Sequence, residues 1–392
     1  YSPDDERGTD PPVNDVVQWV GFVLGVGIVI GTWVSLLDTL VVPRGLSARM
    51  SMVISRAVRR VFLVVANRFD EYDSKDAVLV LQGPITLLAL LLTWIASLLL
   101  GYALLLYPMI DGSFGTALRE SGSAIFTLGF DGPERTGPTI VHLVAAFSGL
   151  IVVALQIAYL PTLYSSFNRR ETLVTMLQSR AGSPAWGPEI LRRHHAVGIL
   201  DNLPALYAEW EQWAADVAES HTNYPILVSF RSPHPLRSWI VGLLAVVDSA
   251  ALYAALSPAS VPSEARLCIR MGFNCMRDIA SALGIPYDPD PLPTDPIELT
   301  FEEFHGAVAQ LDEIGFPMDR SAEDAWRHFR GWRVNYESVA YALADYVVAP
   351  PGPWSGPREH LPGMAIIPQR PADRQPDDTR EERRPKGTGT GW

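Results

Sequence analysis

Charge is scarce in this sequence. Of 392 residues only 19% are Asp, Glu, Lys or Arg, whereas 48% are hydrophobic. That balance is too apolar for a wholly soluble protein, so membrane segments are expected. The apolar residues concentrate in the first half, and the formal net charge of -12 therefore averages over unlike regions.

Cysteine is nearly missing as well. Cys268 and Cys275 stand two helical turns apart in a segment with a helical pattern, and that separation of roughly 10 Å exceeds the reach of a disulfide. We predict two reduced core thiols in a domain that faces the cytoplasm. The first fifteen residues also lack the basic region of a secretory signal peptide, and we expect an acidic tail there.

Long uncharged runs dominate the first half of the chain. A spanning helix needs about 20 mostly apolar residues, and three stretches satisfy this: Val16 to Val42, Ala77 to Tyr107 and Gly137 to Phe167. The first contains one acid, Asp38, and the third contains His142. The sequence therefore predicts three membrane crossings.

Arginines set the expected orientation, because cytoplasmic loops carry an excess of positive charge. Six lie between the first two stretches and three follow the third: Arg44, Arg49, Arg56, Arg59, Arg60, Arg68, Arg169, Arg170 and Arg180. Both regions are thus predicted to be cytoplasmic. The N-terminus and the loop from Met109 to Pro138 are then outside, and everything after Phe167 is inside.

Two local patterns refine this arrangement. The first stretch carries small residues four apart, a spacing that lets helices approach closely in lipid; they are Gly21, Gly25, Gly27 and Gly31. The segment from Arg49 to Val65 gathers arginines on one helical face, which indicates an amphipathic helix on the inner leaflet. A solvated connector that only satisfies the charge rule is the alternative.

The loop between the second and third stretches contains a short, moderately apolar segment, Gly115 to Phe126, followed by Thr127-Leu128-Gly129-Phe130. The segment is too short to cross a membrane but suits a half-membrane helix. Irregular backbone at membrane depth is tolerated only where protein buries it or where it lines a water-filled cavity. The order helix, half-length helix, short strand, helix is that of a pore loop.

These residues resemble the filter of the tetrameric potassium-channel superfamily, whose two-helix prokaryotic members carry Thr-Val-Gly-Tyr-Gly-Asp. Thr127 and Gly129 match, and Leu128 stands in place of valine and Phe130 in place of tyrosine. Asp131 and Gly132 stand in the reverse order, which makes the filter divergent. The resemblance covers about Leu79 to Arg170. It implies a homotetramer around a permeant monovalent cation, potassium first, because each chain supplies one pore loop.

Carried over residue by residue, the resemblance gives each filter position a role. Thr127 supplies the innermost ion site through its hydroxyl and carbonyl, and Leu128, Gly129 and Phe130 supply the carbonyls above it. Asp131 would add a ring of negative charge at the mouth, and it adopts the left-handed backbone region less readily than glycine. Ion selectivity therefore depends on Asp131.

Three residues of the third stretch are candidates for the pore lining or the gate. Gly149 lies near the middle of the stretch, where inner helices of this superfamily have a hinge glycine, and Pro161 is expected to kink the same helix. Gln156 is the strongly polar amide deep in the stretch, and polar groups in membranes tend to face a bundle interior or water. We expect it to line the inner cavity.

After Arg170 the sequence alternates helical patterns with proline breaks, which predicts an all-α cytoplasmic domain. The expected helices are Glu189 to His195, Asp201 to Ser220, Pro235 to Leu256, Pro262 to Leu283, Leu299 to Ile314 and Ser321 to Val348. Residues 238–256 are apolar enough for a fourth span, but a buried helix is favoured because a further crossing would strand an acidic region outside.

The expected fold class is therefore an α-helical membrane protein with a helix, pore helix and filter, helix core, one extra N-terminal transmembrane helix and an all-α cytoplasmic domain. Its parts are an extracellular acidic tail (1–15), the extra transmembrane helix (16–42), a cytoplasmic basic amphipathic linker (43–76), the pore domain (77–170), the helical cytoplasmic domain (171–349) and a disordered tail (350–392).

Two functions fit these expectations. The first is a cation channel in the cell membrane, gated by the cytoplasmic domain. The second is a non-conducting membrane sensor or scaffold that acts through partners of that domain. The sequence shows no catalytic motif, cofactor fingerprint or metal-ligand set, so no enzyme, no cofactor and no metal beyond the permeant cation are expected. The expected partners are membrane lipids and an unidentified protein or small-molecule regulator, and no nucleic acid.

Overall fold

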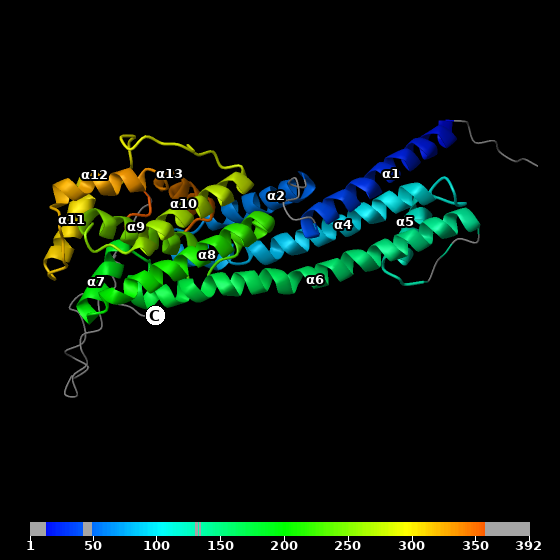
Figure 1. Cartoon of the computed structure of the whole chain (residues 1–392). Coiled ribbons are helices and arrows are strands. Elements are labelled where there is room, and N and C mark those ends of the chain that lie inside the picture. The colour runs from blue at the N-terminus through cyan, green and yellow to red at the C-terminus, as the bar shows by residue number, and fades with distance from the viewer. Residues whose placement is uncertain (1–12, 42–48, 130–131, 133–134, 357–392) are drawn as a thin grey trace, which may run out of the picture. The chain divides into compact units, whose positions relative to one another are not determined.

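The computed structural model describes residues 13–41, 49–129, 132 and 135–356. Across these residues the regular secondary structure is helical throughout, without a strand (Figure 1). Four helical stretches are long and apolar enough to cross a membrane: Val16–Leu40, Tyr72–Leu106, Thr136–Ala181 and Trp239–Leu256. The chain packs as two compact units. Unit 1 is drawn from Tyr1–Val65 and Leu81–Ser165, and unit 2 from Ala66–Val80 and Ser166–Trp392.

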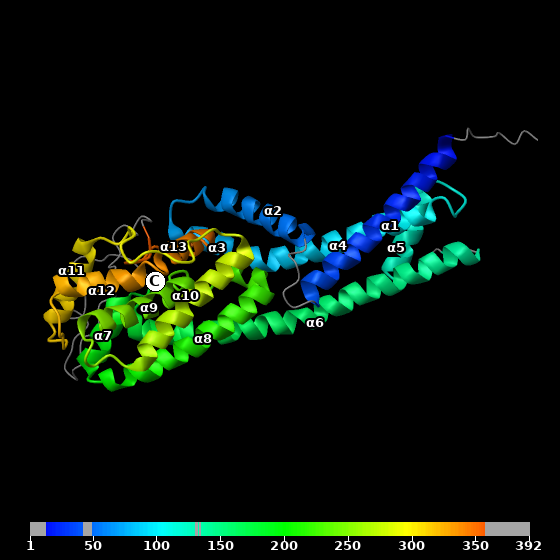
Figure 2. The same ribbon diagram turned by 45° about the horizontal axis from the view of Figure 1, so that its top comes forward.

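Unit 1 contains the helices that lead to the predicted pore loop. They are α1 (Val13–Leu40), α2 (Arg49–Ala66, whose last residue belongs to unit 2), α4 (Gln82–Leu106), α5 (Phe114–Ile125) and the first part of α6 (Thr136–Ala181). Helices α1 and α4 lie side by side in both ribbon views (Figures 1 and 2).

A glycine pair sets the approach of α1 to α4. A Cβ added at Gly25 would lie 2.7 Å from the carbonyl oxygen of Gly101, so neither helix tolerates a larger residue here. The indole nitrogen of Trp94 on α4 also donates to the Ser35 hydroxyl on α1 at 3.3 Å. By contrast, a Cβ at Gly27 or Gly31 would meet no described atom within 4 Å. Of the predicted small-residue pattern, Gly25 makes the close contact.

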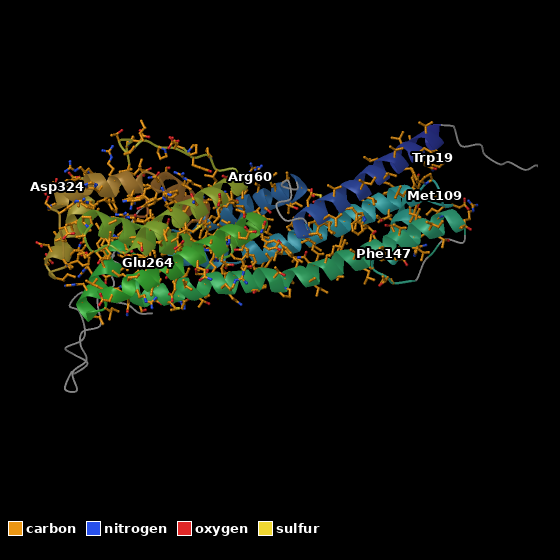
Figure 3. All side chains as sticks on the ribbon, viewed as in Figure 1. Trp19, Arg60, Met109, Phe147, Glu264 and Asp324 are labelled. Atoms are coloured by element: carbon orange, nitrogen blue, oxygen red, sulfur yellow. The ribbon has the colours of Figure 1, made fainter. Side chains whose placement is uncertain are left out.

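Large apolar side chains cover the outer faces of α1 and α6. Trp19 on α1 is 57% exposed and Phe147 on α6 is 61% exposed; both residues are labelled in Figure 3. Soluble monomers rarely expose contiguous apolar surface of this kind. These faces suit lipid or the neighbouring copies of an assembly.

The second predicted span, Ala77 to Tyr107, is interrupted near its start. The helical stretch Tyr72–Leu106 covers nearly all of it, but α3 (Tyr72–Leu79) ends before α4 starts at Gln82. Pro84 explains the break, because a proline lacks the backbone N–H and its ring clashes with the carbonyl four residues earlier, here that of Val80. Residues 66–80, expected in the linker and at the start of the pore domain, pack with unit 2.

Unit 2 is a bundle built around α9 (Trp239–Leu256), which packs against α7 (Gly187–Val197), α10 (Ser263–Leu283), α12 (Ala322–Arg333) and α13 (Glu337–Tyr346). Every residue position of the apolar stretch Trp239–Leu256 in α9 is buried inside the protein, as expected for a buried helix. The other helices of unit 2 are α3, the last part of α6, α8 (Leu203–Asn223) and α11 (Phe301–Asp312), with short 3-10 turns at Leu200–Asn202 and Pro225–Ser229.

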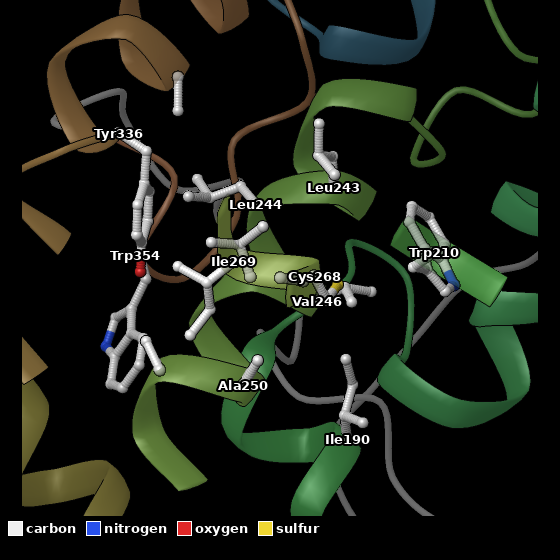
Figure 4. Packing of buried hydrophobic residues seen from close by; sticks show 14 of the residues in the cluster. Ile190, Trp210, Leu243, Leu244, Val246, Ala250, Cys268, Ile269, Tyr336 and Trp354 are labelled. Carbon is white, nitrogen blue, oxygen red and sulfur yellow. The ribbon is translucent and has the colours of Figure 1, made fainter. Parts of the chain in front are cut away.

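Figure 4 shows the centre of this core, where Cys268 of α10 lies beside Val246 of α9. Cys268 and Cys275 are both buried and unbridged, which confirms the prediction of core thiols. Burial raises the pKa of both thiols well above the ordinary value. Gly272 lets α10 approach α9, since an added Cβ would lie 2.4 Å from Val247 Cγ2.

One expected helix is wrong. Ser321 to Val348 was predicted as a continuous helix, but the structure ends α12 at Arg333 and starts α13 at Glu337. The side-chain amide of Asn335 donates to the carbonyls of Gly331 and Trp332 at 3.1 and 3.2 Å. Short polar side chains that bond to nearby backbone in this way compete with helix continuation.

Candidate functional site

The predicted pore loop is built on α5. The helix spans Phe114–Ile125, one residue offset from the predicted segment, and Ser113 caps its start by accepting a bond from the Thr116 backbone N–H at 3.4 Å. The Tyr107 and Phe114 rings pack edge to face with centroids 5.7 Å apart, which fixes the entry into the helix. With only twelve residues, α5 is too short to cross a bilayer.

Two neighbouring helices hold the C-terminal half of α5. From α4, the Leu99 carbonyl accepts a hydrogen bond from the Ser121 hydroxyl at 2.9 Å. From α6, Gly149 lies directly against the Ile125 backbone, since an added Cβ would lie 2.2 Å from the Ile125 carbonyl oxygen. A buried 2.7 Å hydrogen bond between Tyr102 of α4 and Ser148 of α6 joins those two helices at the same level.

The chain leaves α5 through a specific helix-ending motif. Leu128 N–H donates to the Ser123 carbonyl and Thr127 N–H to the Ala124 carbonyl, both at 2.9 Å. This pair of bonds is the Schellman motif, in which the turning residue takes a left-handed backbone and is usually glycine. Here Thr127 occupies that position with φ 53°. A β-branched residue in this region is a genuine outlier, with a cost of about 1–2 kcal/mol.

The loop repeats the left-handed conformation two residues later. Gly129 has φ 69°, and an added Cβ there would meet no described atom within 4 Å. Left-handed backbone at alternate positions turns successive carbonyls toward one side, which an extended strand cannot do. The side chains of Phe126 and Leu128 are 52% and 62% exposed, so the chain itself does not cover this segment.

The electrostatics of the loop favour a cation. The C-terminal end of a helix carries a partial negative charge on its unsatisfied carbonyls. No basic residue lies in the last turn of α5 to neutralise that charge. A cation beside Thr127 and Gly129 would therefore gain from the α5 dipole as well as from the loop carbonyls.

The structure places two of the other predicted site residues, Pro161 and Gln156, within α6. Phe130 and Asp131 lie outside the described residues. Pro161 lies within α6, and the helix continues past it to Ala181. Gln156 is buried, on the same helical face as Val152 and Tyr159, and its Oε1 has no hydrogen-bond partner among the described residues. In the single chain Gln156 thus points to the packed side of α6 and not to its exposed side.

Gly149 has a packing role that the sequence did not reveal. Helix α6 runs unbroken through this position, and the absence of a side chain makes room for the α5 backbone. The hinge expected at Gly149 stays a prediction. Its structural role is therefore close packing that places the loop. Sequence reasoning missed three hydroxyls: that of Ser121 ties the loop helix to α4, and those of Tyr102 and Ser148 join α4 to α6.

Unit 2 contributes buried ion pairs that the sequence did not reveal. Arg333, with no exposed surface, donates to Asp248 at 2.6 Å, to Glu337 at 2.7 Å and to the Tyr341 hydroxyl at 2.8 Å. Arg231 pairs with Asp76 of α3 at 2.5 Å and with the Tyr72 hydroxyl at 2.6 Å. Buried polar networks whose members are all hydrogen-bonded rigidify a core and fix its packing.

His194 is buried in unit 2, and its ring nitrogen Nδ1 lies 2.7 Å from the Ile190 carbonyl oxygen. Burial lowers its pKa below the ordinary value. Among the described residues no cluster of three or more His, Cys, Asp or Glu side chains offers a metal site.

Comparisons with known proteins add no relative. No protein-family model, curated protein or solved structure matches this chain. The α5 loop is thus the candidate site on the strength of its own geometry.

Proposed function

We propose that this protein is one subunit of a cation channel in which four chains surround a central pore lined by the loop after α5. The observation that carries this proposal is the left-handed backbone at Thr127 and again at Gly129, directly after a half-length helix. A filter made of backbone carbonyls needs such alternation. The order α4, α5, loop, α6 and the resemblance of residues 127–130 to a potassium-channel filter support the same function.

The identity of residue 127 gives further support. Glycine would adopt the turn after α5 without strain, yet the sequence keeps a threonine at φ 53°. Backbone strain of this kind is retained where the surrounding contacts hold the residue in place, and it is found most often at functional sites. A hydroxyl and a carbonyl that both bind a cation would account for a threonine here.

The exposed loop supports an assembly of several chains. Phe126, Thr127 and Leu128 are exposed in the single chain, although irregular backbone at membrane depth has to be buried in protein or line a water-filled cavity. A fourfold arrangement satisfies both conditions, because each loop then faces the pore axis and packs against its neighbours.

Gating by unit 2 forms part of the proposal. Helix α6 runs without interruption from the pore region into unit 2, and α3, the helix that directly precedes α4, packs in unit 2 through Arg231 and Asp76. Both helices that flank the loop helix are therefore covalently continuous with unit 2. In the proposed topology the N-terminus is outside and unit 2 lies in the cytoplasm, as the arginine distribution favours.

The test is ion flux through purified protein in liposomes, with potassium compared with sodium. Gly129→Ala should abolish potassium flux, because a side chain at φ 69° strains the backbone whatever the space around it. Gly132→Ala is the matched control: this glycine of the same loop has no left-handed φ, and the nearest atom to an added Cβ, of His142, is 3.9 Å away. Its flux should remain near that of the unchanged protein.

Two results would overturn the proposal. One is the absence of flux for either ion from well-folded protein, which would favour the non-conducting sensor or scaffold. The other is a monomer or dimer in mild detergent and in liposomes, because a filter of this design needs four loops. Equal loss of flux in Gly129→Ala and Gly132→Ala would remove the special role of the alternating backbone.

A further inference from the structure

Unit 2 contains a basic groove whose residues are far in the sequence from the α5 loop. It has a volume of about 440 Å³ and is lined by Ala254, Pro258, Arg266, Arg270, Arg320, His328 and Trp332. Three of these side chains are guanidinium groups, one is an imidazole, and none is a carboxylate. A concentration of positive charge is unexpected in a chain whose net charge is -12.

Regular helix spacing builds the groove. Arg266 and Arg270 are four residues apart on α10, and His328 and Trp332 are four apart on α12, so each pair lies on one face of its helix. Arg320 is anchored at the end of α9, where its Nη1 donates to the Ala255 carbonyl at 3.1 Å. The backbone N–H groups of Asp319 and Arg320 both donate to the Leu256 carbonyl, which fixes the loop that carries Arg320.

The charges in the groove are not neutralised by the chain. Within the described residues, the guanidiniums of Arg266 and Arg270 form no hydrogen bond or ion pair, and both side chains are exposed. The nearby acids are used elsewhere: Asp319 accepts from the Ala259 N–H at 3.0 Å, and Asp324 pairs with Arg327 at 2.8 Å. The pKa of His328 is lowered by partial burial and then by the charges of Arg320 and Arg327.

We propose that this groove binds a soluble organic phosphate that carries a flat aromatic ring, the chemistry of a nucleotide. Guanidinium groups match phosphate oxygens in geometry and charge. The Trp332 indole supplies a face on which an aromatic ring stacks. The volume also falls within the range of about 300–1,000 Å³ typical of small-molecule sites.

This site goes beyond the proposed channel and is tested without measuring current. Full-length protein in detergent is titrated by calorimetry with ADP, inorganic pyrophosphate, adenosine and sulfate. ADP should bind, pyrophosphate should bind more weakly, and adenosine and sulfate should bind little. Arg266→Gln and Arg270→Gln should each weaken ADP binding by about tenfold, the factor that corresponds to about 1.4 kcal/mol.

Two further variants separate the parts of the proposal. Trp332→Leu should weaken ADP binding and leave pyrophosphate binding unchanged, because only ADP has a ring to stack. Arg327→Gln is the matched control, since Arg327 lies on the same helix but pairs with Asp324 at the surface, and its ADP affinity should be unchanged. Arg266 and Arg270 touch no described side chain through hydrogen bonds, so their variants should keep the unfolding temperature of the original protein.

Several results would overturn the proposal. ADP and pyrophosphate that fail to bind at millimolar concentration would remove the site, and an equal loss in Arg327→Gln and Arg266→Gln would show unspecific attraction. Binding only to vesicles that contain a phosphorylated inositol lipid would replace the soluble ligand by a headgroup. Protein that binds ADP but carries no ion flux would leave this inference standing while it removes the proposed channel.

Discussion

Gly149 of α6 touches the backbone of Ile125 at the last turn of α5. The contact is so close that a Cβ on residue 149 would lie 2.2 Å from the Ile125 carbonyl oxygen and 2.9 Å from its carbonyl carbon. Backbone cannot move aside as a flexible side chain does, so this contact sets how near the loop helix stands to α6. The position of the candidate filter, which follows α5, therefore depends on the absence of a side chain at residue 149.

We expect Gly149→Ala to lower the free energy of unfolding by about 1–3 kcal/mol, the usual cost of overpacking, and to abolish potassium flux. The measurement is thermal unfolding in detergent together with liposome flux. Gly31→Ala is the control, because a Cβ there meets no described atom within 4 Å. A Gly149→Ala protein with unchanged stability would contradict the close contact.

Thr127→Gly should separate stability from function. Relief of a left-handed β-branched residue gains about 1–2 kcal/mol, of which glycine's extra chain entropy removes about 0.5–1 kcal/mol. The free energy of unfolding should rise by about 1 kcal/mol while potassium flux falls, because the hydroxyl is lost. Thr127→Ala loses the hydroxyl but keeps a Cβ, so its flux should fall without the gain in stability. Flux that survives both substitutions would argue against a role for the hydroxyl.

Removal of the Arg333 side chain should destabilise unit 2 severely. In Arg333→Met the carboxylates of Asp248 and Glu337, both buried, lose their cation, and the loss of one partner of a buried pair costs about 3–5 kcal/mol. Chemical denaturation followed by circular dichroism measures the effect. Arg327→Met is the control, since its surface pair with Asp324 is worth about 0–1 kcal/mol. Similar losses in the two variants would contradict the network.

The contact between Arg231 and α3 should contribute to the proposed gating of the pore by unit 2. Arg231 binds Asp76 and the carbonyls of Val347 and Val348, and Val348 is itself held at φ 50°. Arg231→Gln should therefore lower the unfolding free energy by about 2–4 kcal/mol, as expected for a largely buried charge pair, and should change flux without a change in ion preference. Altered selectivity in this variant would place Arg231 in the filter's own support and not in gating.

Stability should fall as the solution becomes acidic. The His221 ring is fully buried, with Nε2 3.0 Å from Arg170, and its pKa lies well below 6.5 because burial, and then the Arg170 charge, opposes protonation. His194 is shifted in the same direction by burial. As the pH falls, these histidines are protonated in the unfolded chain before they are protonated in the folded chain. Their contribution to the free energy of unfolding is therefore complete above about pH 6.5 and decreases below it, by up to about 1.4 kcal/mol per pH unit for each histidine.

Unfolding temperatures across pH 7.5 to about 5.5 test this dependence. Ordinary carboxylates titrate below this range, whereas buried Asp248, whose pKa is raised to about 6, titrates within it with the opposite sign in every variant compared. His221→Asn should make the slope smaller, because one of the histidines with a lowered pKa is gone. A slope that steepens, or stays the same, in His221→Asn would contradict the assignment.

Local patterns in the sequence were sufficient for the helices and for the extent of the loop segment. Gly115 to Phe126 was expected and α5 spans Phe114–Ile125, because a short apolar run between two uncharged runs is visible in composition alone. The helix from Ser321 to Val348 was predicted wrongly, because its interruption depends on one side chain, Asn335, which binds the backbone behind it. The helical spacing of apolar residues does not predict whether a polar side chain will form such a competing hydrogen bond.

The sequence by itself determined that the chain is helical, that its first half contains stretches apolar enough to cross a membrane, and that Thr127 to Phe130 follow a half-length segment. These properties follow from composition and from spacing along the chain. Only the tertiary structure decided that Gly149 is a packing contact, that Gln156 points inward, that Thr127 is left-handed, and that Arg266, Arg270 and Trp332 share one groove. Each of these depends on which residues from distant parts of the chain come within a few ångströms of one another, and a linear pattern carries no such distance.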